Sequence, residues 1–379
     1  MISRIKDSII NNLKNILGWK TSRKIVVFSV DDYGNVRLNS KEARAKLDEA
    51  GLKVYSRFDL LDTLETKQDL EQLYAVLDSV KDKNGRPAVF TPFALPCNID
   101  FEKMEANDFQ HYYYEKLPDT YAKLANQQPE AYAGAWEVWK EGIAKGFLKP
   151  QFHGREHLNL TVFNDKLKKR DFELLTALKN KSYTSISDDD YPTMSSTAAF
   201  DFWDSKENVS LKPIIKEGLQ LFEEVYGYSS TYFTPPVYNI HHSLFATLKE
   251  NGIHYIDLGL IRKEHQGLNS YKTSFNYTGK KTVEGLNIMV RNVVFEPTQD
   301  RGLDWVNFTM KQIERAFRWN RAAIISSHRV NFCGHIDPKN REKGLQTLRK
   351  LLQAIVEKWP DVEFMAADEL GDYLSKQIK

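Results

Sequence analysis

The sequence predicts an α/β fold in which parallel strands alternate with helices to form one barrel-like domain. Short strand-like segments alternate with longer amphipathic segments from end to end, which is typical of βαβ units and a parallel sheet. Several of the strand-like segments are almost entirely apolar, as expected of strands covered on both faces. The 379 residues contain no internal repeat or long flexible linker, and barrels of this length are common as single units.

Nine segments have the apolar character of strands. They are residues 24–31, 87–93, 148–153, 182–187, 230–235, 254–258, 288–295, 322–328 and 362–366. Six longer segments repeat apolar residues at helical spacing. They are residues 67–81, 165–180, 211–226, 241–251, 304–319 and 340–358. We expect residues 23–379 to fold as a single domain.

Two segments exceed what a minimal barrel needs. Residues 97–135 contain three consecutive tyrosines and a polar helical region, and residues 186–210 contain an aspartate triplet followed by Ser, Thr and Ala. Both follow predicted strands, so we expect both insertions to lie over the face formed by the carboxyl ends of the strands. The triplet lacks the spacing and the glycine of a calcium loop and is expected to be a solvated turn.

Residues 1–22 are expected to form an amphipathic helix. Apolar residues recur at helical spacing, at Ile5, Ile9, Ile10, Leu13, Ile16 and Leu17. This stripe suits packing on the barrel or on a partner, and residues 1–18 also suit peripheral contact with a membrane surface. Polar residues interrupt the apolar core that a signal peptide needs, and no stretch reaches the ~18 apolar residues of a membrane span. We therefore expect a cytoplasmic protein.

Composition excludes some classes of partner. The net charge of +2 gives no electrostatic case for nucleic acid. Cys97 and Cys333 are the only cysteines, too few for a disulfide framework.

Aromatic residues make up 12%, which suits a large core or a carbohydrate-lined groove. Trp136 and Trp139 lie three apart on an expected helix and are assigned to the core.

An aspartate pair ends the first predicted strand. Asp31 and Asp32 follow an apolar run and precede a Gly-Asn turn. In α/β folds, ligands and catalytic groups gather at the carboxyl ends of strands. Adjacent carboxylates repel each other, so a metal ion, a basic side chain or water must stabilise them. The pair alone equally suits capping of the following turn.

Two histidines follow the predicted strand 148–153. His153 and His157 are four residues apart and face the same way on a helical turn. Two imidazoles and one carboxylate, with open positions, form the ligand set of a catalytic Zn²⁺ or Fe²⁺ site. The spacing is a weak signal in a chain with nine histidines, but together with the aspartate pair it predicts a metal site.

Four short motifs occur in a set order along the chain. They are Asp31-Asp32, His153-x₃-His157, Pro235-Pro236-x-Tyr238 and Ser327-His328. This order resembles the polysaccharide deacetylases of the carbohydrate esterase family 4 type, and the resemblance covers residues 24–374 in element order. It implies a distorted (β/α) barrel of about seven parallel strands with elaborated loops over the catalytic face. It also implies a divalent metal and removal of acyl groups from amino sugars.

The resemblance assigns a role to each residue of the first two motifs. It makes Asp31 the general base, and Asp32, His153 and His157 the metal ligands. The chemistry is consistent, because a metal with three protein ligands polarises an amide carbonyl. One carboxylate must stay off the metal to accept the proton of the attacking water.

The predicted strand 322–328 ends at His328, which matches the general acid of the family. Histidine suits this role because its pKa lies near neutrality. Asp257, at the end of the predicted strand 254–258, is expected to orient it. A lone histidine at a strand end equally suits a hydrogen-bonded structural residue.

The chain departs from the family pattern around the proline pair. Thr234 stands where the family commonly has an arginine that steadies the base. Tyr238, displaced by Val237, is expected to contribute a backbone N–H to the oxyanion. The proline pair equally suits a turn that ends a strand. We expect Arg155 or Arg291 to supply the missing charge from another strand.

Further polar residues lie near the predicted ligands. Arg155, Glu156 and Asn159 are candidates to orient the ligands. Arg291, Asn292 and Glu296 are candidates to contact sugar hydroxyls. Either set equally suits a surface salt-bridge network.

The leading hypothesis is therefore a metal-dependent hydrolase that removes an acyl group, in the first place N-acetyl, from a carbohydrate. Zinc is the default metal, and iron, cobalt or nickel also suit the ligands. The alternative is a carbohydrate-binding protein with a degenerate site on the same fold. A glycoside hydrolase ranks last, because Asp31 and Asp32 are adjacent and cannot flank a glycosidic bond. The sequence does not predict the oligomeric state.

Overall fold

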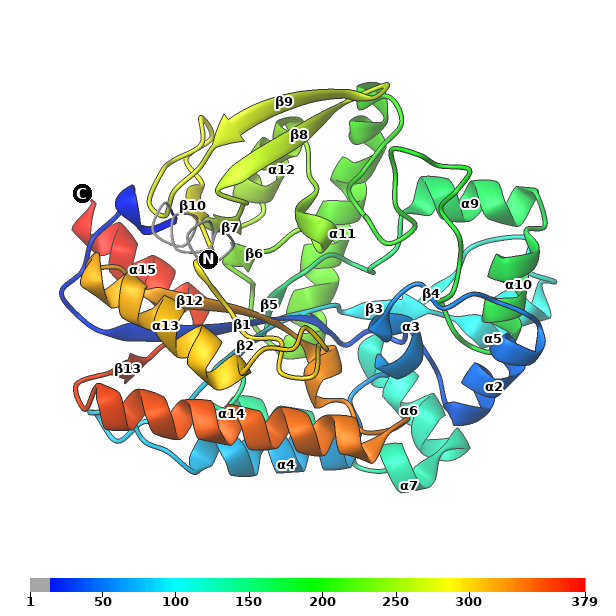
Figure 1. The fold of residues 1–379 in the computed structure, drawn as a ribbon. Helices are drawn as coiled ribbons and strands as arrows, with labels where there is room; N and C mark the ends of the chain where they lie inside the picture. The colour runs from blue at the N-terminus through cyan, green and yellow to red at the C-terminus, as the bar shows by residue number, and fades with distance from the viewer. Residues whose placement is uncertain (1–13, 379) are drawn as a thin grey trace.

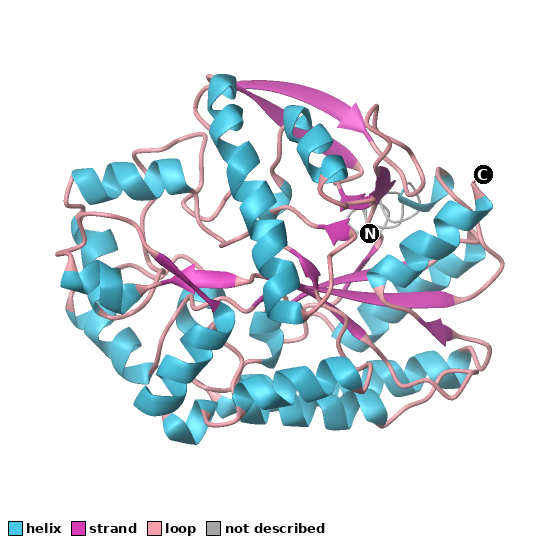
Figure 2. Cartoon of the chain, turned by 180° about the vertical axis from the view of Figure 1, so that it is seen from behind, coloured by secondary structure: helices cyan, strands magenta, loops and turns pink. Residues whose placement is uncertain are grey.

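The structure is a computed structural model that describes residues 14–378, and these form an α/β fold (Figures 1 and 2). The strands are β1 (Ile25–Tyr33), β2 (Phe90–Ala94), β3 (Cys97–Ile99), β4 (Tyr114–Lys116), β5 (Gln151–Phe152), β6 (Tyr232–Phe233), β7 (Tyr255–Asp257), β8 (Ile261–Gly267), β9 (Ser270–Phe275), β10 (Asn287–Met289), β11 (Val293–Val294), β12 (Ala323–His328) and β13 (Glu363–Phe364). The helices are α2 (Lys41–Glu49), α3 (Arg57–Leu61), α4 (Lys67–Asp78), α5 (Phe101–Ala106), α6 (Leu117–Gln127), α7 (Pro129–Tyr132), α8 (Ala135–Ala144), α9 (Leu160–Lys168), α10 (Phe172–Lys179), α11 (Asn208–Tyr226), α12 (Phe245–Glu250), α13 (Trp305–Arg318), α14 (Pro338–Lys358) and α15 (Ala367–Gln377).

One parallel sheet organises the molecule. Its strands follow the order β10-β7-β6-β5-β2-β1-β12-β11, and β13 pairs with β1 outside this path. Neighbouring strands in the path run parallel. The sheet is curled into a half-barrel with α4 and α14 packed side by side on its outside (Figure 1). The prediction of a distorted (β/α) barrel is confirmed.

The predicted strand 288–295 is divided into two. Its first half, β10, pairs with β7 at one end of the sheet, and its second half, β11, pairs with β12 at the other end. The side chain of Asn292 replaces ladder bonds at the division: its amide donates to the Ala322 carbonyl (2.9 Å) and accepts from the Ile324 N–H (2.8 Å). The two ends of the sheet are thus joined through the short segment 290–292, which carries Arg291.

Alternate side chains of β1 point into two separate hydrophobic cores. Ile25 and Val27 lie in a cluster that includes Leu370 of α15, whereas Val26 and Phe28 belong to the large core beneath the outer helices. Successive side chains of a strand point to opposite faces. The strand is therefore apolar on both sides up to the aspartate pair at its carboxyl end.

The predicted strand 182–187 is wrong, because this segment is a loop. The Tyr183 N–H donates to the carbonyl of Arg37 (2.8 Å), and Thr184 and Ser185 bond the Asp59 carboxylate (2.6 and 3.1 Å). Bonds to the loop after β1 and to α3 take the place of a β ladder.

Other differences concern helix 165–180 and two hairpins. The predicted helix is divided into α9 and α10 at Arg170, whose φ is 53°. The hairpins β3–β4 and β8–β9 were not predicted, because segments such as Arg262–His265 are strongly polar. The β8–β9 hairpin crosses the top of the molecule in Figure 1, and its residue His265 bonds Asp201 in the predicted insertion 186–210 (2.8 Å).

The N-terminal segment packs on the barrel. Residues 14–16 are helical and residues 17–22 are not, while the predicted helix over 1–13 lies outside the described residues. The guanidinium of Arg321 donates to four backbone carbonyls between Asn15 and Trp19. No helix within residues 14–378 has both the length and the apolar character to cross a membrane.

Candidate metal centre and active site

The aspartate pair at the end of β1 directs both carboxylates into one cavity. Neighbouring side chains of a regular strand would point to opposite faces. Here the pairing of β1 with β2 shifts register after Val30, and Asp32 adopts a left-handed φ of 75°. A positive φ is uncommon outside glycine, although Asp tolerates it. Asp31 and Asp32 are each 4% exposed and line a cavity of about 330 Å³.

Asp32 lies against the two predicted histidine ligands. Its Oδ1 is 3.2 Å from His157 Nε2 and 3.6 Å from His153 Nε2, and one donor atom from each residue lies within 4.8 Å of the others. His153 Nδ1 is hydrogen-bonded to the carbonyl oxygen of Thr234 at 2.7 Å. Among the described residues, His153 Nε2 is buried without a hydrogen-bond partner. A ligand nitrogen left free by a bond on the opposite ring nitrogen is the arrangement of metal-binding histidines.

The ionisation states of Asp32 and His157 favour binding of a cation. Burial would raise the pKa of Asp32, but the imidazoles of His153 and His157 beside it outweigh this effect and hold the pKa well below its usual value. Burial lowers the pKa of His157 against the opposing effect of Asp32. An ionised carboxylate and a neutral imidazole are the forms that bind metals.

Arg291 holds the other aspartate. Its two terminal nitrogens lie 2.7 and 2.8 Å from the oxygens of Asp31, a bidentate pair. Its Nε donates to Asp257 (2.7 Å), and Thr234 Oγ1 accepts from Arg291 (3.0 Å) while donating to Asp257 (2.7 Å). Of the two arginines considered, Arg291 therefore contacts Asp31, and Arg155 bonds Glu156.

His328 is oriented by Glu296, so the expectation that Asp257 orients it is wrong. His328 Nδ1 lies 2.6 Å from Glu296 Oε1, and its Nε2 is 4.0 Å from Asp31. Burial would lower the pKa of His328, but the charge and hydrogen bond of Glu296, with Asp32 and Asp31, raise it to about 9. The imidazole is thus held protonated at neutral pH. Asp257 instead supports Arg291.

Tyr238 and Val237 line the same cavity from a turn after β6. Both have left-handed φ values, 55° and 56°. The Tyr238 N–H donates to the Pro235 carbonyl at 2.9 Å. This N–H is therefore engaged inside the turn.

Arg155, Glu156 and Asn159, the other residues predicted in this segment, bond to elements around the loop that carries His157. Arg155 bonds Glu156 and also Glu217 of α11. Asn159 caps α9 and donates to the carbonyls of Ala198 and Asp201 (both 2.9 Å). These contacts fix the loop that carries His157 to neighbouring elements.

Sequence reasoning missed one wall of the cavity. Arg37, Ser56, Phe58 and Thr197 complete the lining. Arg37 lies over the Phe58 ring (4.9 Å), and this ring makes an edge contact with His328 (5.4 Å). The position of Arg37 shortly after the aspartate pair was the available signal.

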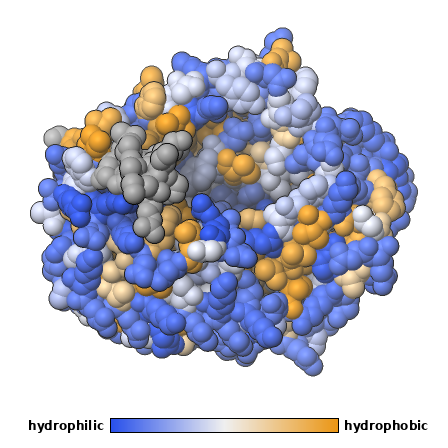
Figure 3. Space-filling view, viewed as in Figure 1, coloured by the Kyte–Doolittle hydropathy of each residue, from blue (hydrophilic) through white to orange (hydrophobic). Residues whose placement is uncertain are grey.

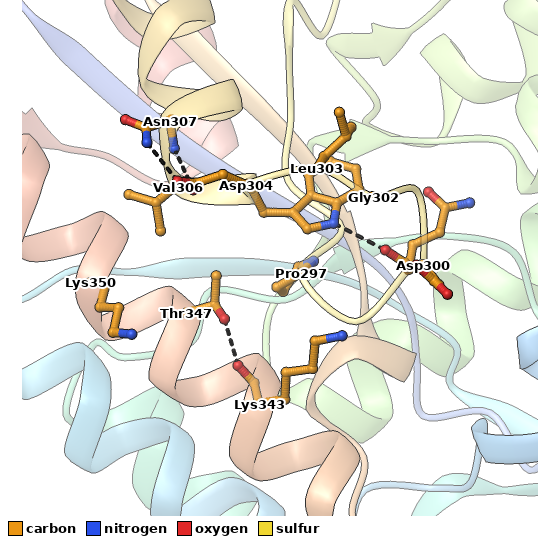
Figure 4. Close-up of a pocket in the computed structure, with 12 residues that line it drawn as sticks. Pro297, Asp300, Gly302, Leu303, Asp304, Val306, Asn307, Lys343, Thr347 and Lys350 are labelled. Carbon is orange, nitrogen blue, oxygen red and sulfur yellow. Dashed lines mark hydrogen bonds between the residues drawn. The ribbon is translucent and has the colours of Figure 1, made fainter.

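Another cavity lies away from the candidate site. It has a volume of about 530 Å³ and lies between α14 and the loop that precedes α13. Figure 4 shows Lys343 and Lys350 on one side of it and Asp304 on the other. Its lining includes none of the candidate site residues.

Comparisons with known proteins show a likeness of fold. No protein-family model and no curated protein matches the chain. A solved structure described as a probable polysaccharide deacetylase from Pseudomonas aeruginosa PAO1 is 10% identical, with a TM-score of 0.45, over 94% of this chain and 92% of that one. A GH57 branching enzyme from Thermococcus kodakaraensis is 10% identical with a TM-score of 0.46, over 92% and 70%. An alpha-amylase from Thermotoga maritima is 12% identical with a TM-score of 0.44, over 92% and 74%. At these scores the likeness carries no argument about activity.

Proposed function

We propose that this protein is a metal-dependent hydrolase that removes an acyl group, in the first place N-acetyl, from a carbohydrate. One observation carries the proposal. A buried cluster of two histidines and one carboxylate shares its cavity with a second carboxylate and a third histidine. Metal ligands, a proton acceptor and a proton donor are the groups that amide hydrolysis requires.

Asp32, His153 and His157 are the residues that would hold the metal. The donor set fits, because His153 Nε2 is buried and free of partners among the described residues and the three donor atoms converge. A divalent ion bound there supplies a Lewis acid that polarises the acyl carbonyl and lowers the pKa of water. Zinc suits this set, as do iron, cobalt and nickel.

Asp31 is the proposed general base. It accepts a proton from the attacking water, and Arg291 fixes its orientation and compensates its charge next to Asp32. This contact replaces the arginine that the family pattern places at Thr234.

His328 is the proposed general acid. Glu296 keeps its imidazole protonated at neutral pH, so it carries a proton for the leaving nitrogen. Its Nε2 lies 4.0 Å from Asp31, and this proximity supports paired roles for the two groups as proton donor and proton acceptor.

Metal content and acetate release test the proposal together. Protein purified without added metal or chelator is compared with the His153→Ala/His157→Ala variant, and Asp31→Asn serves as the matched control. We expect about one equivalent of metal in the wild type and in Asp31→Asn, none in the double variant, and acetate release from acetylated sugars in the wild type alone. Turnover by metal-free protein contradicts the mechanism. No metal even after loading with zinc favours a binding protein with a degenerate site.

A further inference from the structure

The outer face of the β8–β9 hairpin exposes apolar side chains. Ile261 lies opposite Phe275 in the ladder, and His265 lies opposite Tyr271, so alternate residues of the two strands share one face. Ile261, Tyr271 and Phe275 are all exposed on it. Monomeric proteins rarely expose a large continuous apolar patch unless it binds something. This face is therefore a candidate interaction surface.

The apolar surface continues beyond both ends of the two strands. At the tip of the hairpin Leu268 is exposed, and its N–H donates to the carbonyl of Trp203 (3.0 Å), whose side chain is also exposed. The loop that follows β9 carries Val283, which is fully exposed. In Figure 3, hydrophobic and hydrophilic side chains alternate along the upper edge of the molecule, where Figure 1 places the hairpin. We call this surface the hairpin face and define it by Ile261, Leu268, Tyr271, Phe275 and Val283.

The exposed charges of the hairpin are positive. Between Ile261 and Phe275 the only acidic residue is Glu264, which is buried and lies 2.6 Å from Arg262. The side chains of Lys263 and Lys272 are exposed and form no ion pair with any described residue. The whole chain has a net charge of only +2, so the local excess comes from the arrangement of its charges. Such a surface attracts an anionic partner.

A cavity beside β9 combines cationic and apolar groups. It has a volume of about 300 Å³ and is lined by four basic side chains that outnumber two carboxylates, Glu264 and Glu284. The basic residues are Arg262, Lys272, Lys280 and Lys281, and apolar residues of the lining are Phe245, Leu258, Val283 and Ile288. Positive charge next to apolar side chains matches a phospholipid, in which a phosphate adjoins acyl chains.

The charge pattern argues against a second copy of this chain as the partner. A two-fold dimer uses the same patch on both subunits, so the exposed lysines of one hairpin would face those of the other. Like charges across an interface repel each other. An anionic bilayer accepts both kinds of side chain, because lysines contact the headgroups while aromatic and aliphatic side chains enter the interface.

The hairpin face lies beside the candidate active site. A cavity of about 270 Å³ is lined by Ile261 and Lys263 of the hairpin and by Val237 and Tyr238. Val237 and Tyr238 also line the cavity that contains Asp31. A partner bound to the hairpin face is therefore held close to this cavity.

We propose that the hairpin face docks the protein on the surface of an anionic phospholipid bilayer. Ile261, Leu268 and Phe275 enter the interface. Lys263, Lys272 and Lys281 contact lipid phosphates. Docking places the mouth of the candidate active site beside the bilayer, and it is independent of the reaction proposed for that site.

Co-sedimentation with vesicles measures the docking. We expect the full-length protein to bind phosphatidylcholine vesicles that contain phosphatidylserine, to bind poorly to phosphatidylcholine alone, and to be released by added salt. The variant Lys263→Gln/Lys272→Gln/Lys281→Gln should lower the partition coefficient about fivefold per lysine, or about a hundredfold in all. The matched control, Lys41→Gln/Lys46→Gln/Lys53→Gln, removes the same charge from exposed positions on and after α2 and should lower it much less.

A second pair of variants tests the apolar contribution. Phe275→Ser should lower the partition coefficient about tenfold, because the ring no longer leaves water on docking. Phe172→Ser is the matched control, since Phe172 on α10 is 65% exposed and Phe275 is 64% exposed. Both rings are largely in water, so both variants should remain folded, which circular dichroism checks.

Four results would overturn the proposal. Vesicle binding that is unchanged in Phe275→Ser and in the hairpin lysine variant assigns the docking to another surface. Binding that is lost only on deletion of residues 1–13 assigns it to the N-terminal segment. A dimer in analytical ultracentrifugation that Phe275→Ser dissociates, without vesicle binding, assigns the face to a second copy. Binding of polyglutamate as tight as that of the vesicles, with no contribution from Phe275, assigns it to an acidic protein. None of these measurements uses acetate release, so failure of the docking and failure of the proposed hydrolase are distinguishable.

Discussion

Arg291 lies 260 positions after Asp31, yet its guanidinium holds both oxygens of that carboxylate. Asp257 and Thr234 fix the guanidinium from the other side. The aspartate pair therefore consists of two unlike groups, one facing two imidazoles and one facing an arginine. At the residue scale this difference supports the proposed roles of Asp32 as a metal ligand and Asp31 as the base.

The two arginines considered for Asp31 provide a matched test. We predict that Arg291→Met lowers kcat about a hundredfold, because the base loses its orientation and charge compensation. Arg155→Met removes an equally buried ion pair that does not touch Asp31 and should lower kcat much less than Arg291→Met does. Acetate release is measured per folded protein, determined by circular dichroism. Equal losses in both variants would contradict the assignment.

The pH profile tests the general acid. The acid must be protonated, and Glu296 raises the pKa of His328 to about 9. Turnover should therefore persist through neutral pH and fall as the pH rises through about 9. Glu296→Gln removes the stabilising charge, so the alkaline limb should move to lower pH. An unmoved limb in this variant would assign the titration to another group.

At the scale of elements, the division between β10 and β11 positions the site. β10 pairs with β7 at one end of the sheet and β11 pairs with β12 at the other, so the segment between them connects the two ends. The chain changes partner at residues 290–292, where Asn292 supplies the missing ladder bonds and Arg291 points to Asp31. The same short segment, residues 290–292, connects the two ends of the sheet and carries the arginine that compensates the charge of Asp31.

Loss of the hydrogen bonds of the Asn292 side chain should lower the free energy of unfolding. Asn292→Ala leaves a buried carbonyl at Ala322 and a buried N–H at Ile324 without partners, at about 1–3 kcal/mol each. We predict a free energy of unfolding lower by roughly 2–6 kcal/mol in urea titrations. Asn126→Ala, at an exposed position of α6, is the control and should change it little. A change below about 1 kcal/mol in Asn292→Ala would mean that the bonds to the backbone are dispensable.

Sequence patterns predicted the elements whose signal is local. The apolar runs of β1 and β12 and the helical spacing of α13 and α14 correspond to observed elements. The strand assigned to 182–187 failed because Asp59, far away in sequence, provides its hydrogen bonds. The polar hairpin β8–β9 carries no apolar alternation to detect. Arg291 was one of two candidates, and only the divided strand distinguishes it from Arg155.

At the scale of the whole molecule, the candidate centre joins three distant parts of the chain. Asp32 comes from β1, the two histidines from the segment after β5, and the carbonyl that holds His153 from Thr234 after β6. A ligand that binds Asp32 and both histidines stabilises the folded state alone, since the unfolded chain does not hold these residues together.

Metal binding should therefore raise the melting temperature. Zinc at a hundred times its Kd adds about 2.7 kcal/mol, which corresponds to roughly 3 °C for a chain of this length. Differential scanning calorimetry with and without zinc measures the shift. His153→Ala should abolish it, whereas Glu42→Ala on exposed α2 should retain it. A shift that persists in His153→Ala would place the binding site elsewhere.

The pairing of β1 with β12 puts Asp31 directly opposite His328, at nearly opposite ends of the chain. Contacts of such long sequence separation form late, because a large loop must close before they contribute. We therefore expect the proposed base and acid to meet only once the intervening βα units have assembled. During refolding, helical circular dichroism should return before turnover, and the delay measures the time that the barrel needs to close. The activity then serves as the reporter of completed folding.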